Sequence, residues 1–246
     1  MAKKQRLDKA IAMQGSLSRS EVKTLIRKGA VTVNGQVVKN ADFGVDFDSD
    51  IVAVQGKELS LSMHIYLMLN KPKGVVSASE DKKLPTVVDL VPKELWRKGL
   101  FPAGRLDKDT TGFVLITDDG EFAHDILSPK KHISKTYHAL VNGTITDEMV
   151  EGFAKGVTIG EDFTLPASLK KISSEEQGDW GEVILKEGMY HQIKRMFGAY
   201  GLKVLELKRV QMGKLPLDPN LEEGKCRELT AEELRLVSTR DESTEE

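Results

Sequence analysis

The dipeptide Asn34-Gly35 separates two short apolar-rich segments, residues 31–33 and 36–38. Asn and Gly readily adopt the backbone angles of a two-residue turn, and this pair between apolar arms is the strongest short-range signal for a β-hairpin. The apolar residues before this hairpin have helical spacing, and the first sixty residues are expected to form one compact unit.

Two short helices are predicted before the hairpin. The first has apolar residues at helical spacing and ends near Gly15. Ser18 and Glu21 have the spacing of a capping box, which predicts that a second helix begins there and ends at Gly29. The apolar residues of the first helix are Leu7, Ala10 and Ile11.

The second predicted helix carries a basic stripe at positions i, i+4 and i+8, formed by Arg19, Lys23 and Arg27. An apolar stripe lies roughly 110° away around the same helix, at about 100° per residue. One face can therefore pack on a core while the neighbouring face meets phosphates. An ordinary amphipathic surface helix shows the same pattern, so the helix alone leaves both interpretations open.

The distribution of charge is more informative than the formal net charge of −2. Residues 1–40 have a balance of +7, whereas residues 228–246 have a balance of −5. Nucleic-acid binding depends on local potential and not on the total, so a basic head with an acidic tail is compatible with a nucleic-acid partner. A solvated basic surface remains an equally simple explanation.

Composition excludes several classes of protein. With 39% hydrophobic and 30% charged residues the chain is typical of a globular protein, not of a disordered or fibrous one. The longest apolar run, residues 65–69, is far shorter than the roughly 20 residues of a membrane span, and no secretory signal is evident. The single cysteine, Cys226, excludes an internal disulfide and multi-thiolate metal sites. We expect a cytoplasmic protein with no membrane partner.

The chain beyond residue 60 is expected to form a second domain. A linker is predicted at residues 61–64, a domain at 65–236 and an acidic, disordered tail at 237–246. Strands and helices do not alternate regularly, which favours an α+β fold with a mixed, mainly antiparallel sheet flanked by helices. The predicted strands are residues 65–69, 113–117, 136–141, 180–186 and 204–210, and the predicted helices are residues 121–127, 147–155 and 190–200.

Residues 104–112, Gly-Arg-Leu-Asp-Lys-Asp-Thr-Thr-Gly, run directly into an apolar strand. Glycines and aspartates are common in ordinary surface turns. The aspartates also have calcium-loop spacing, but an EF-hand needs helices on both sides, and here a strand follows. The third interpretation is a catalytic carboxylate, Asp107, on a rigid turn. A glycosidase would need two carboxylates, and Asp109 would then be the second. The residues alone do not choose between a plain turn and catalysis.

Two further segments combine aromatic and basic residues. Tyr137 follows Lys135 in a predicted strand, and residues 187–197 contain Tyr190 and the pair Lys194-Arg195. Each has an ordinary structural explanation, because a strand tyrosine is usually part of a core and a basic pair is usually a solvated face.

Taken in this order, the segments resemble the bacterial pseudouridine synthases of the RsuA type, across about residues 4–236. Residues 1–60 are similar to the RNA-binding domain named after ribosomal protein S-four. The motifs that carry the resemblance are Gly104-Arg105-Leu106-Asp107 with Thr110-Thr111-Gly112, Lys135-Thr136-Tyr137, Glu187-Gly188 with Tyr190-His191-Gln192-Ile193-Lys194-Arg195-Met196, and Asn70-Lys71-Pro72-Lys73-Gly74.

The resemblance implies an isomerase that converts a uridine within RNA to pseudouridine and needs neither cofactor nor metal. It implies that Asp107 is the essential carboxylate, acting on the sugar or the base, and that Lys194 is its ion-pair partner. Tyr137 matches the tyrosine that stacks on the target base, and Arg105 is a candidate to fill the space left by the extruded nucleotide.

The resemblance also implies an RNA-binding surface in both domains and ribosomal RNA as the partner. The sequence of the Tyr190–Met196 motif is more similar to the branch of the family that acts on 16S rRNA. A 23S rRNA synthase of the same family, or a catalytically idle RNA-binding or ribosome-assembly factor, are the alternatives. The family suggests a monomer with no obligatory protein partner. The residues expected to contact RNA are Arg6, Arg19, Lys23, Arg27, Lys28, Arg105, Lys135 and Arg195.

Overall fold

The computed structural model describes residues 4–15, 17–128 and 133–239. Contacts divide the chain into two compact units. The first unit comprises residues Met1–Ile65 and Val91–Leu100, and the second comprises Tyr66–Leu90 and Phe101–Glu246. The sequence assigned residues 91–100 to the second domain, but their contacts belong to the first unit: the Arg97 guanidinium donates to the Gln14 side chain at 2.7 Å and to the Ser62 carbonyl at 3.0 Å.

The two helices of the first unit lie where the sequence predicts them. They are α1 (Leu7–Met13) and α2 (Arg19–Arg27). The predicted capping box is present at the start of α2, where the Ser18 amide donates to Glu21 Oε2 at 2.8 Å and the Glu21 amide donates back to Ser18 Oγ at 3.4 Å. These bonds satisfy amides that have no partner within the helix.

The predicted hairpin is also confirmed. Asn34 and Gly35 have φ values of 51° and 78°, the two positive angles of a type I′ turn. The hairpin belongs to a four-stranded sheet, while β1 and β4 form a separate two-stranded ladder. In spatial order the sheet contains β3 (Gln36–Val37), β2 (Val31–Val33), β5 (Val52–Val54) and β6 (Lys57–Leu59), and the ladder joins β1 (Gln5–Arg6) to β4 (Gly44–Val45).

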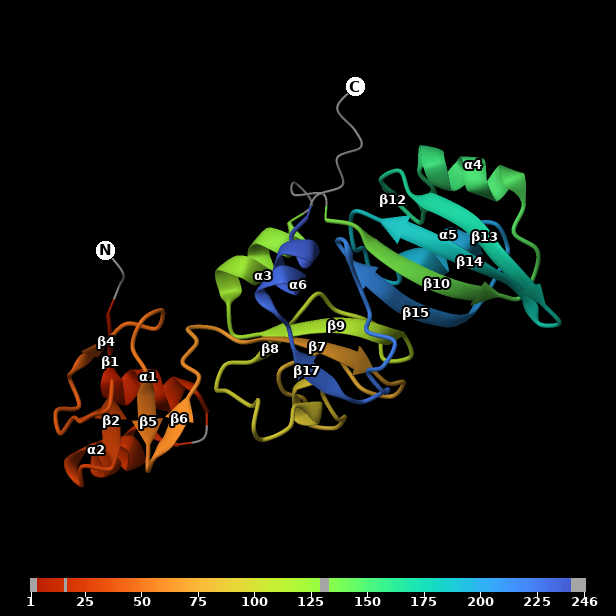
Figure 1. The fold of residues 1–246 in the computed structure, drawn as a ribbon. Coiled ribbons are helices and arrows are strands. Elements are labelled where there is room, and N and C mark those ends of the chain that lie inside the picture. Colours follow the sequence, from red (N-terminus) through yellow and green to blue (C-terminus); the bar gives the residue numbers. More distant parts are fainter. Residues whose placement is uncertain (1–3, 16, 129–132, 240–246) are drawn as a thin grey trace. The chain divides into compact units, whose positions relative to one another are not determined.

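The second unit is built on a nine-stranded sheet (Figure 1). Strands β9 and β15 pair in parallel, and the other neighbours along the sheet pair antiparallel. This is the mixed, mainly antiparallel sheet that the sequence predicts. Its order is β13 (Ser168–Glu175), β14 (Gly178–Leu185), β10 (Lys135–Val141), β15 (Val204–Met212), β9 (Thr111–Thr117), β7 (Tyr66–Lys71) and β17 (Cys226–Glu228), with β8 (Phe101–Ala103) on β9 and β16 (Leu215–Pro216) on β15.

Helices cover parts of this sheet, as Figure 1 shows for α3 beside β8 and for α4 beside β13, while α6 contacts β16. The helix predicted at residues 190–200 is shorter than expected, because His191 has a φ of 49°, a left-handed conformation that does not continue a right-handed helix. The elements are α3 (Gly120–Leu127), α4 (Asp147–Lys155), α5 (Gln192–Gly198), α6 (Ala231–Val237), a 3₁₀ turn at Val88–Leu90, and a small hairpin of β11 (Thr158–Ile159) and β12 (Asp162–Phe163).

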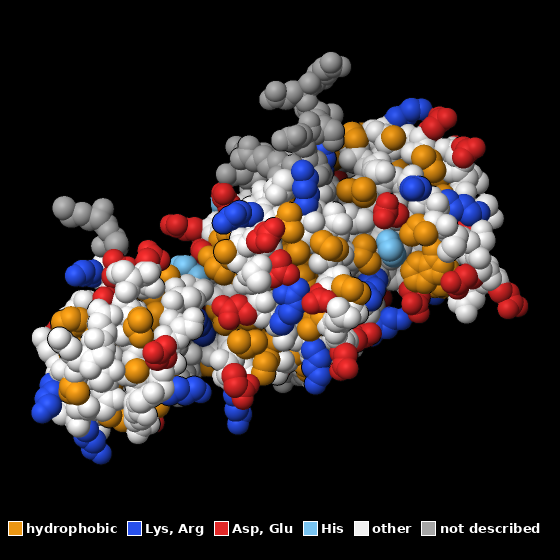
Figure 2. Space-filling view, viewed as in Figure 1, with side chains coloured by type: hydrophobic (Ala, Val, Ile, Leu, Met, Phe, Trp, Pro, Cys, Tyr) orange, Lys and Arg blue, Asp and Glu red, His pale blue; other side chains and the backbone are white. Residues whose placement is uncertain are grey.

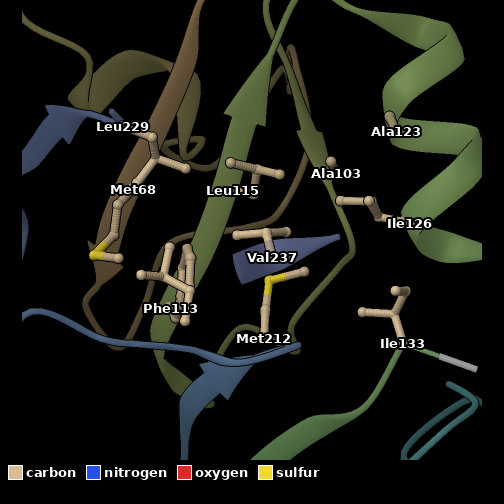
Figure 3. Packing of buried hydrophobic residues seen from close by; sticks show 11 residues of the cluster. Met68, Ala103, Phe113, Leu115, Ala123, Ile126, Ile133, Met212, Leu229 and Val237 are labelled. Atoms are coloured by element: carbon tan, nitrogen blue, oxygen red, sulfur yellow. The ribbon is translucent and has the colours of Figure 1, made fainter. Parts of the chain in front are cut away.

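Each unit has its own hydrophobic cluster. In the second unit Phe113 and Leu115 of β9 lie beside Met68 of β7, and Met212 and Val237 pack into the same group (Figure 3). Val237 is fully buried, so the core extends one residue beyond the boundary predicted at residue 236. Of the predicted acidic tail, residues 240–246 lie outside the described part of the chain.

Basic and acidic side chains are interspersed on the face of the second unit that Figure 2 presents, while Lys and Arg side chains lie along the edge of the first unit where Figure 1 places α2. Among the described residues, none of the helices has the length and hydropathy to cross a membrane.

Candidate active site

The turn that carries Asp107 is fixed at its end by the start of β9. Gly112 has a φ of 97°, and a Cβ atom built there would lie 2.2 Å from the Arg209 carbonyl oxygen on β15. Only glycine allows the two parallel strands to approach so closely. Within the turn, the Thr110 amide donates to the Asp107 carbonyl at 3.1 Å.

A buried lysine holds the same turn from within. Lys71 is fully buried, and its Nζ donates to the carbonyl oxygens of Thr110 at 2.8 Å, Pro72 at 3.0 Å and Lys108 at 3.2 Å. Burial lowers the pKa of Lys71 to about 8, although the negative charges of Asp109 and Asp107 act in the opposite direction. The lysine of the Asn-Lys-Pro motif therefore supports the turn that carries Asp107.

A buried arginine holds the beginning of the segment. Arg209 is 2% exposed, and its guanidinium donates to the Phe113 carbonyl at 2.7 Å and to the Gly104 carbonyl at 3.3 Å. Lys71 and Arg209 together satisfy backbone acceptors on both sides of Asp107. Because buried carbonyl groups are costly to leave unpaired, these bonds restrict the turn to one conformation.

The ion pair expected between Asp107 and Lys194 is present. Lys194 Nζ lies 3.0 Å from Asp107 Oδ2 and 2.7 Å from Asp109 Oδ1. The side chains of Lys194 and Asp107 are 24% and 25% exposed, whereas that of Asp109 is 70% exposed. Burial lowers the pKa of Lys194, but hydrogen bonds to Asp109 and Asp107 outweigh it and the pKa is raised. The hydrogen bond from Lys194 lowers the pKa of Asp109.

The structure adds His191, which sequence reasoning did not assign to the site. Its Nε2 lies 3.4 Å from Asp107 Oδ1, on the other carboxylate oxygen from the one that Lys194 contacts. The sequence contained one indication that His191 lies near Lys194: it precedes Lys194 by three residues, close to one helical turn. That signal was hidden because His191 is the left-handed N-cap of α5 and not a residue within the helix.

The loop that carries His191 is held by a buried glutamine. Gln192 Oε1 accepts from the Met189 amide at 2.9 Å, and Gln192 Nε2 donates to Glu187 Oε1 at 2.6 Å. The same Glu187 oxygen accepts from the Leu165 amide at 2.8 Å. The Glu187-Gly188 and His191-Gln192 motifs therefore form one hydrogen-bonded loop between β14 and α5.

Asp107 and Tyr137 line one pocket, whose empty volume, including the part open to solvent, is about 440 Å³. Tyr137 comes from β10, opposite Val183 of β14, and is 8% exposed. The exposed residue Arg105 and the newly assigned His191 line the same pocket. A carboxylate paired with a lysine, an aromatic side chain and a guanidinium thus meet around one open pocket, as a site for a nucleotide requires.

Two residues expected to contact RNA in this unit are placed differently. Lys135 is 7% exposed, and burial together with the nearby Arg209 charge lowers its pKa to about 8. Arg195 donates to the Ile159 carbonyl and contacts Asp162 at 3.4 Å, so it ties α5 to the β11–β12 hairpin. Lys135 therefore leaves the proposed RNA-binding set because its side chain is buried. Arg195 is 34% exposed and stays in the set as a proposal, with part of its guanidinium already paired within the unit.

The basic residues of the first unit surround an acid. Asp8 is fully buried, and its oxygens lie 3.1 Å from Arg6 Nε, 2.9 Å from Arg19 Nη2 and 3.8 Å from Lys23 Nζ. Burial raises the pKa of Asp8, but hydrogen bonds from the two arginines outweigh it and the pKa is lowered. The basic stripe is therefore partly neutralised, while Arg27 and Lys28 are exposed at the end of α2.

Comparisons with known proteins show which family the chain belongs to. The pattern of the RNA pseudouridylate synthase family matches residues 65–199, and that of the S4 domain matches residues 5–52. The chain therefore belongs to the RNA pseudouridine synthases, which are isomerases, and carries an S4 domain before the catalytic domain.

Individual relatives match over almost the whole chain. The uncharacterized RNA pseudouridine synthase YtzG of Bacillus subtilis is 44% identical over 95% of this chain and 98% of its own. The ribosomal small subunit pseudouridine synthase A of Escherichia coli is 43% identical over 94% of this chain and 99% of its own. A crystal structure of a pseudouridylate synthase, 37% identical, covers 94% of this chain and 99% of its own with a TM-score of 0.63.

Proposed function

We propose that this protein isomerises one uridine of small-subunit (16S) ribosomal RNA to pseudouridine. The observation that carries the proposal is the Asp107–Lys194 ion pair beside a pocket that Tyr137 also lines. The choice of small-subunit RNA is supported by the similarity to ribosomal small subunit pseudouridine synthase A over nearly the full length of both chains. We also propose that the protein acts as a cytoplasmic monomer.

In the proposed reaction Asp107 is the carboxylate that acts on the sugar or the base, as nucleophile or proton acceptor. The bond between the ribose and N1 of uracil breaks, the base rotates and C5 joins the ribose. The C5 hydrogen leaves to water as a proton and N1 takes up a proton, so the composition of the nucleotide does not change. If Asp107 has formed a bond to the sugar or the base, that bond breaks again before the product leaves. Lys194 holds the Asp107 carboxylate from one oxygen and His191 contacts the other, so the carboxylate is kept in one orientation. Such positioning avoids a loss of entropy at the reacting step.

Tyr137 and Arg105 are proposed to act on the nucleotide itself. The largely buried Tyr137 ring would stack on the freed uracil, because an aromatic face retains a base without demanding one orientation. The target nucleotide must leave its helical stack to enter the pocket. Arg105, exposed while lining the pocket, would occupy the space that the nucleotide leaves.

The remaining basic residues are proposed to hold the RNA through its phosphates. Exposed cations at the end of α2 and the partly neutralised group around Asp8 supply this positive charge in the S4 domain. Contacts of this kind position RNA without reading its bases and weaken as salt rises. Selection of the target then depends on RNA shape and an accessible loop.

The test uses ribosomal RNA labelled with tritium at C5 of uridine. Isomerisation replaces the C5 hydrogen, so the full-length protein should release tritium to water while the RNA chain stays intact. RNA binding without tritium release would show an idle binding protein, and free uracil would show a hydrolase. Assays with 16S and 23S transcripts, followed by mapping of pseudouridine in the product, distinguish the two ribosomal substrates.

A further inference from the structure

Tyr190 is an exposed aromatic residue at the edge of the site. Its side chain is 75% exposed, the largest exposed fraction among the large hydrophobic side chains of the described residues. Its ring stacks on that of His191, with centroids 3.8 Å apart and planes 19° apart. One face of the tyrosine is therefore covered by a histidine while the rest of the ring lies open to solvent.

The backbone of the loop around Tyr190 is held by several hydrogen bonds. Gln192 and Glu187 bond the loop on both sides of it, and the Tyr190 carbonyl accepts from Arg195 Nη1 at 3.4 Å. With its backbone bonded and its ring stacked on His191, Tyr190 is already ordered before a base stacks on it, and a smaller loss of conformational freedom favours binding.

The position of Tyr190 separates it from the target pocket. Its neighbours Met189 and His191 line the pocket, but Tyr190 does not. The largely buried Tyr137 already supplies the aromatic side chain inside. An exposed ring just outside a nucleoside pocket is placed to meet a base other than the one that reacts.

We propose that the exposed face of Tyr190 is a stacking site for a second nucleobase of the substrate RNA, one that neighbours the extruded uridine. The inference rests on the proposed function. Unstacked bases of RNA loops are commonly held on aromatic side chains, and such stacking tolerates different bases. Since His191 contacts both the Tyr190 ring and the Asp107 carboxylate, the base on Tyr190 would set the position of the RNA chain relative to the carboxylate.

The test compares Tyr190→Leu and Tyr190→Phe with the unchanged full-length protein on an RNA fragment that contains the target loop. Loss of one stacked base should raise KM about tenfold in Tyr190→Leu, with a smaller effect on kcat, whereas Tyr190→Phe should retain a normal KM. Phe163→Leu, which removes another exposed aromatic ring of the same unit outside the pocket, is the matched control and should leave KM unchanged.

Tyr190→Leu could also act by removing the ring that stacks on His191. RNA fragments with an abasic site at each position beside the target uridine separate this effect from the loss of base stacking. In the unchanged protein one abasic position should raise KM as Tyr190→Leu does, and in Tyr190→Leu that position should have no further effect. The inference would be overturned if the abasic site raised KM in Tyr190→Leu as much as in the unchanged protein. It would also be overturned if Tyr190→Leu had a normal KM on the intact RNA, or if the substitution lowered only kcat. Absence of tritium release by the unchanged protein would instead reject the proposed function, and the same RNA fragments would then test stacking through Kd.

Discussion

At the scale of single residues, the two aspartates of the turn differ although they share one lysine. Lys194 Nζ contacts both, but only Asp107 lines the pocket, and the Asp109 side chain is 70% exposed. The shared contact means that the ion pair alone does not identify the proposed reacting carboxylate. The position of Asp107 in the pocket is what supports its choice over Asp109.

Asp107→Asn should therefore lower kcat by roughly a thousandfold or more while RNA affinity is largely kept, because a nucleophile or base is lost without loss of shape. Asp109→Asn is the matched variant, since it removes the other carboxylate from the same lysine and should keep most of the activity. Tritium release and RNA binding measure the two effects. Substantial turnover by Asp107→Asn would remove the catalytic role of Asp107.

Two buried lysines with similar pKa values should respond to substitution in opposite directions. Lys135 has a pKa of about 8 in the fold against 10.5 for the unperturbed group, so the fold disfavours its charged form. Below pH 8 the lysine is charged in both the folded and unfolded states, and Lys135→Met should stabilise the fold by about 2–3 kcal/mol. Between pH 8 and 10.5 the folded protein loses this proton first, so the difference should shrink and then vanish.

Urea unfolding of the unchanged protein and of Lys135→Met between pH 7 and 11 measures the difference in their free energies of unfolding. Lys71→Met is the control with the opposite sign, because it leaves the carbonyl groups of Pro72, Lys108 and Thr110 without their donor. A destabilised Lys135→Met at pH 7 would show that the Lys135 ammonium group is compensated in the fold.

The residues that sequence reasoning could identify are those that take part in motifs. Asp107, Lys194 and Tyr137 were named from the family resemblance that short motifs carry, and the Asp107–Lys194 pair lies within hydrogen-bond distance. His191 and the supports Lys71, Arg209 and Gln192 were not assigned these contacts. The partners of His191, Lys71 and Arg209 lie mostly in distant parts of the chain, in and around the 104–113 segment, so these contacts depend on a tertiary arrangement that no local pattern contains.

At the scale of elements, α2 was predicted well because its signals are local. Its capping box, apolar face and terminal glycine all lie within a dozen residues. The strands that sequence reasoning missed have weak local signals. Strand β13 is mostly exposed and reads Ser-Leu-Lys-Lys-Ile-Ser-Ser-Glu, and β17 has only three residues. Both are strands because β14 and β7 supply their hydrogen-bond partners.

The charges on α2 should contribute unequally to RNA binding. Arg27 and Lys28 are exposed, whereas the Arg19 guanidinium is bound to the buried Asp8 at 2.9 Å. Replacing Arg27 and Lys28 together by Ala should lower the slope of log Kd against log salt by about 1 for each phosphate that the variant no longer binds. Arg19→Ala should lower it less. Equal slopes for all the variants and the unchanged protein would show that this face of α2 does not meet phosphates.

At the scale of the whole molecule, each unit has its own hydrophobic cluster and one of the two tryptophans. Trp96 lies in the segment 91–100 that joins the first unit, and Trp180 lies on β14 of the second. The local pattern could not reveal that residues 91–100 return to the first unit, because that return depends on Arg97 reaching Gln14 and Ser62.

The two tryptophans allow each unit to be followed separately. Val237 is fully buried in the cluster of the second unit, so Val237→Ala should destabilise that unit by about 2 kcal/mol. In a Trp96→Phe background, the Trp180 fluorescence midpoint in urea should fall. In a Trp180→Phe background, the Trp96 midpoint should stay where it is, because Val237 has no place in the first cluster. Equal shifts of both midpoints would show that the two units unfold as one cooperative structure.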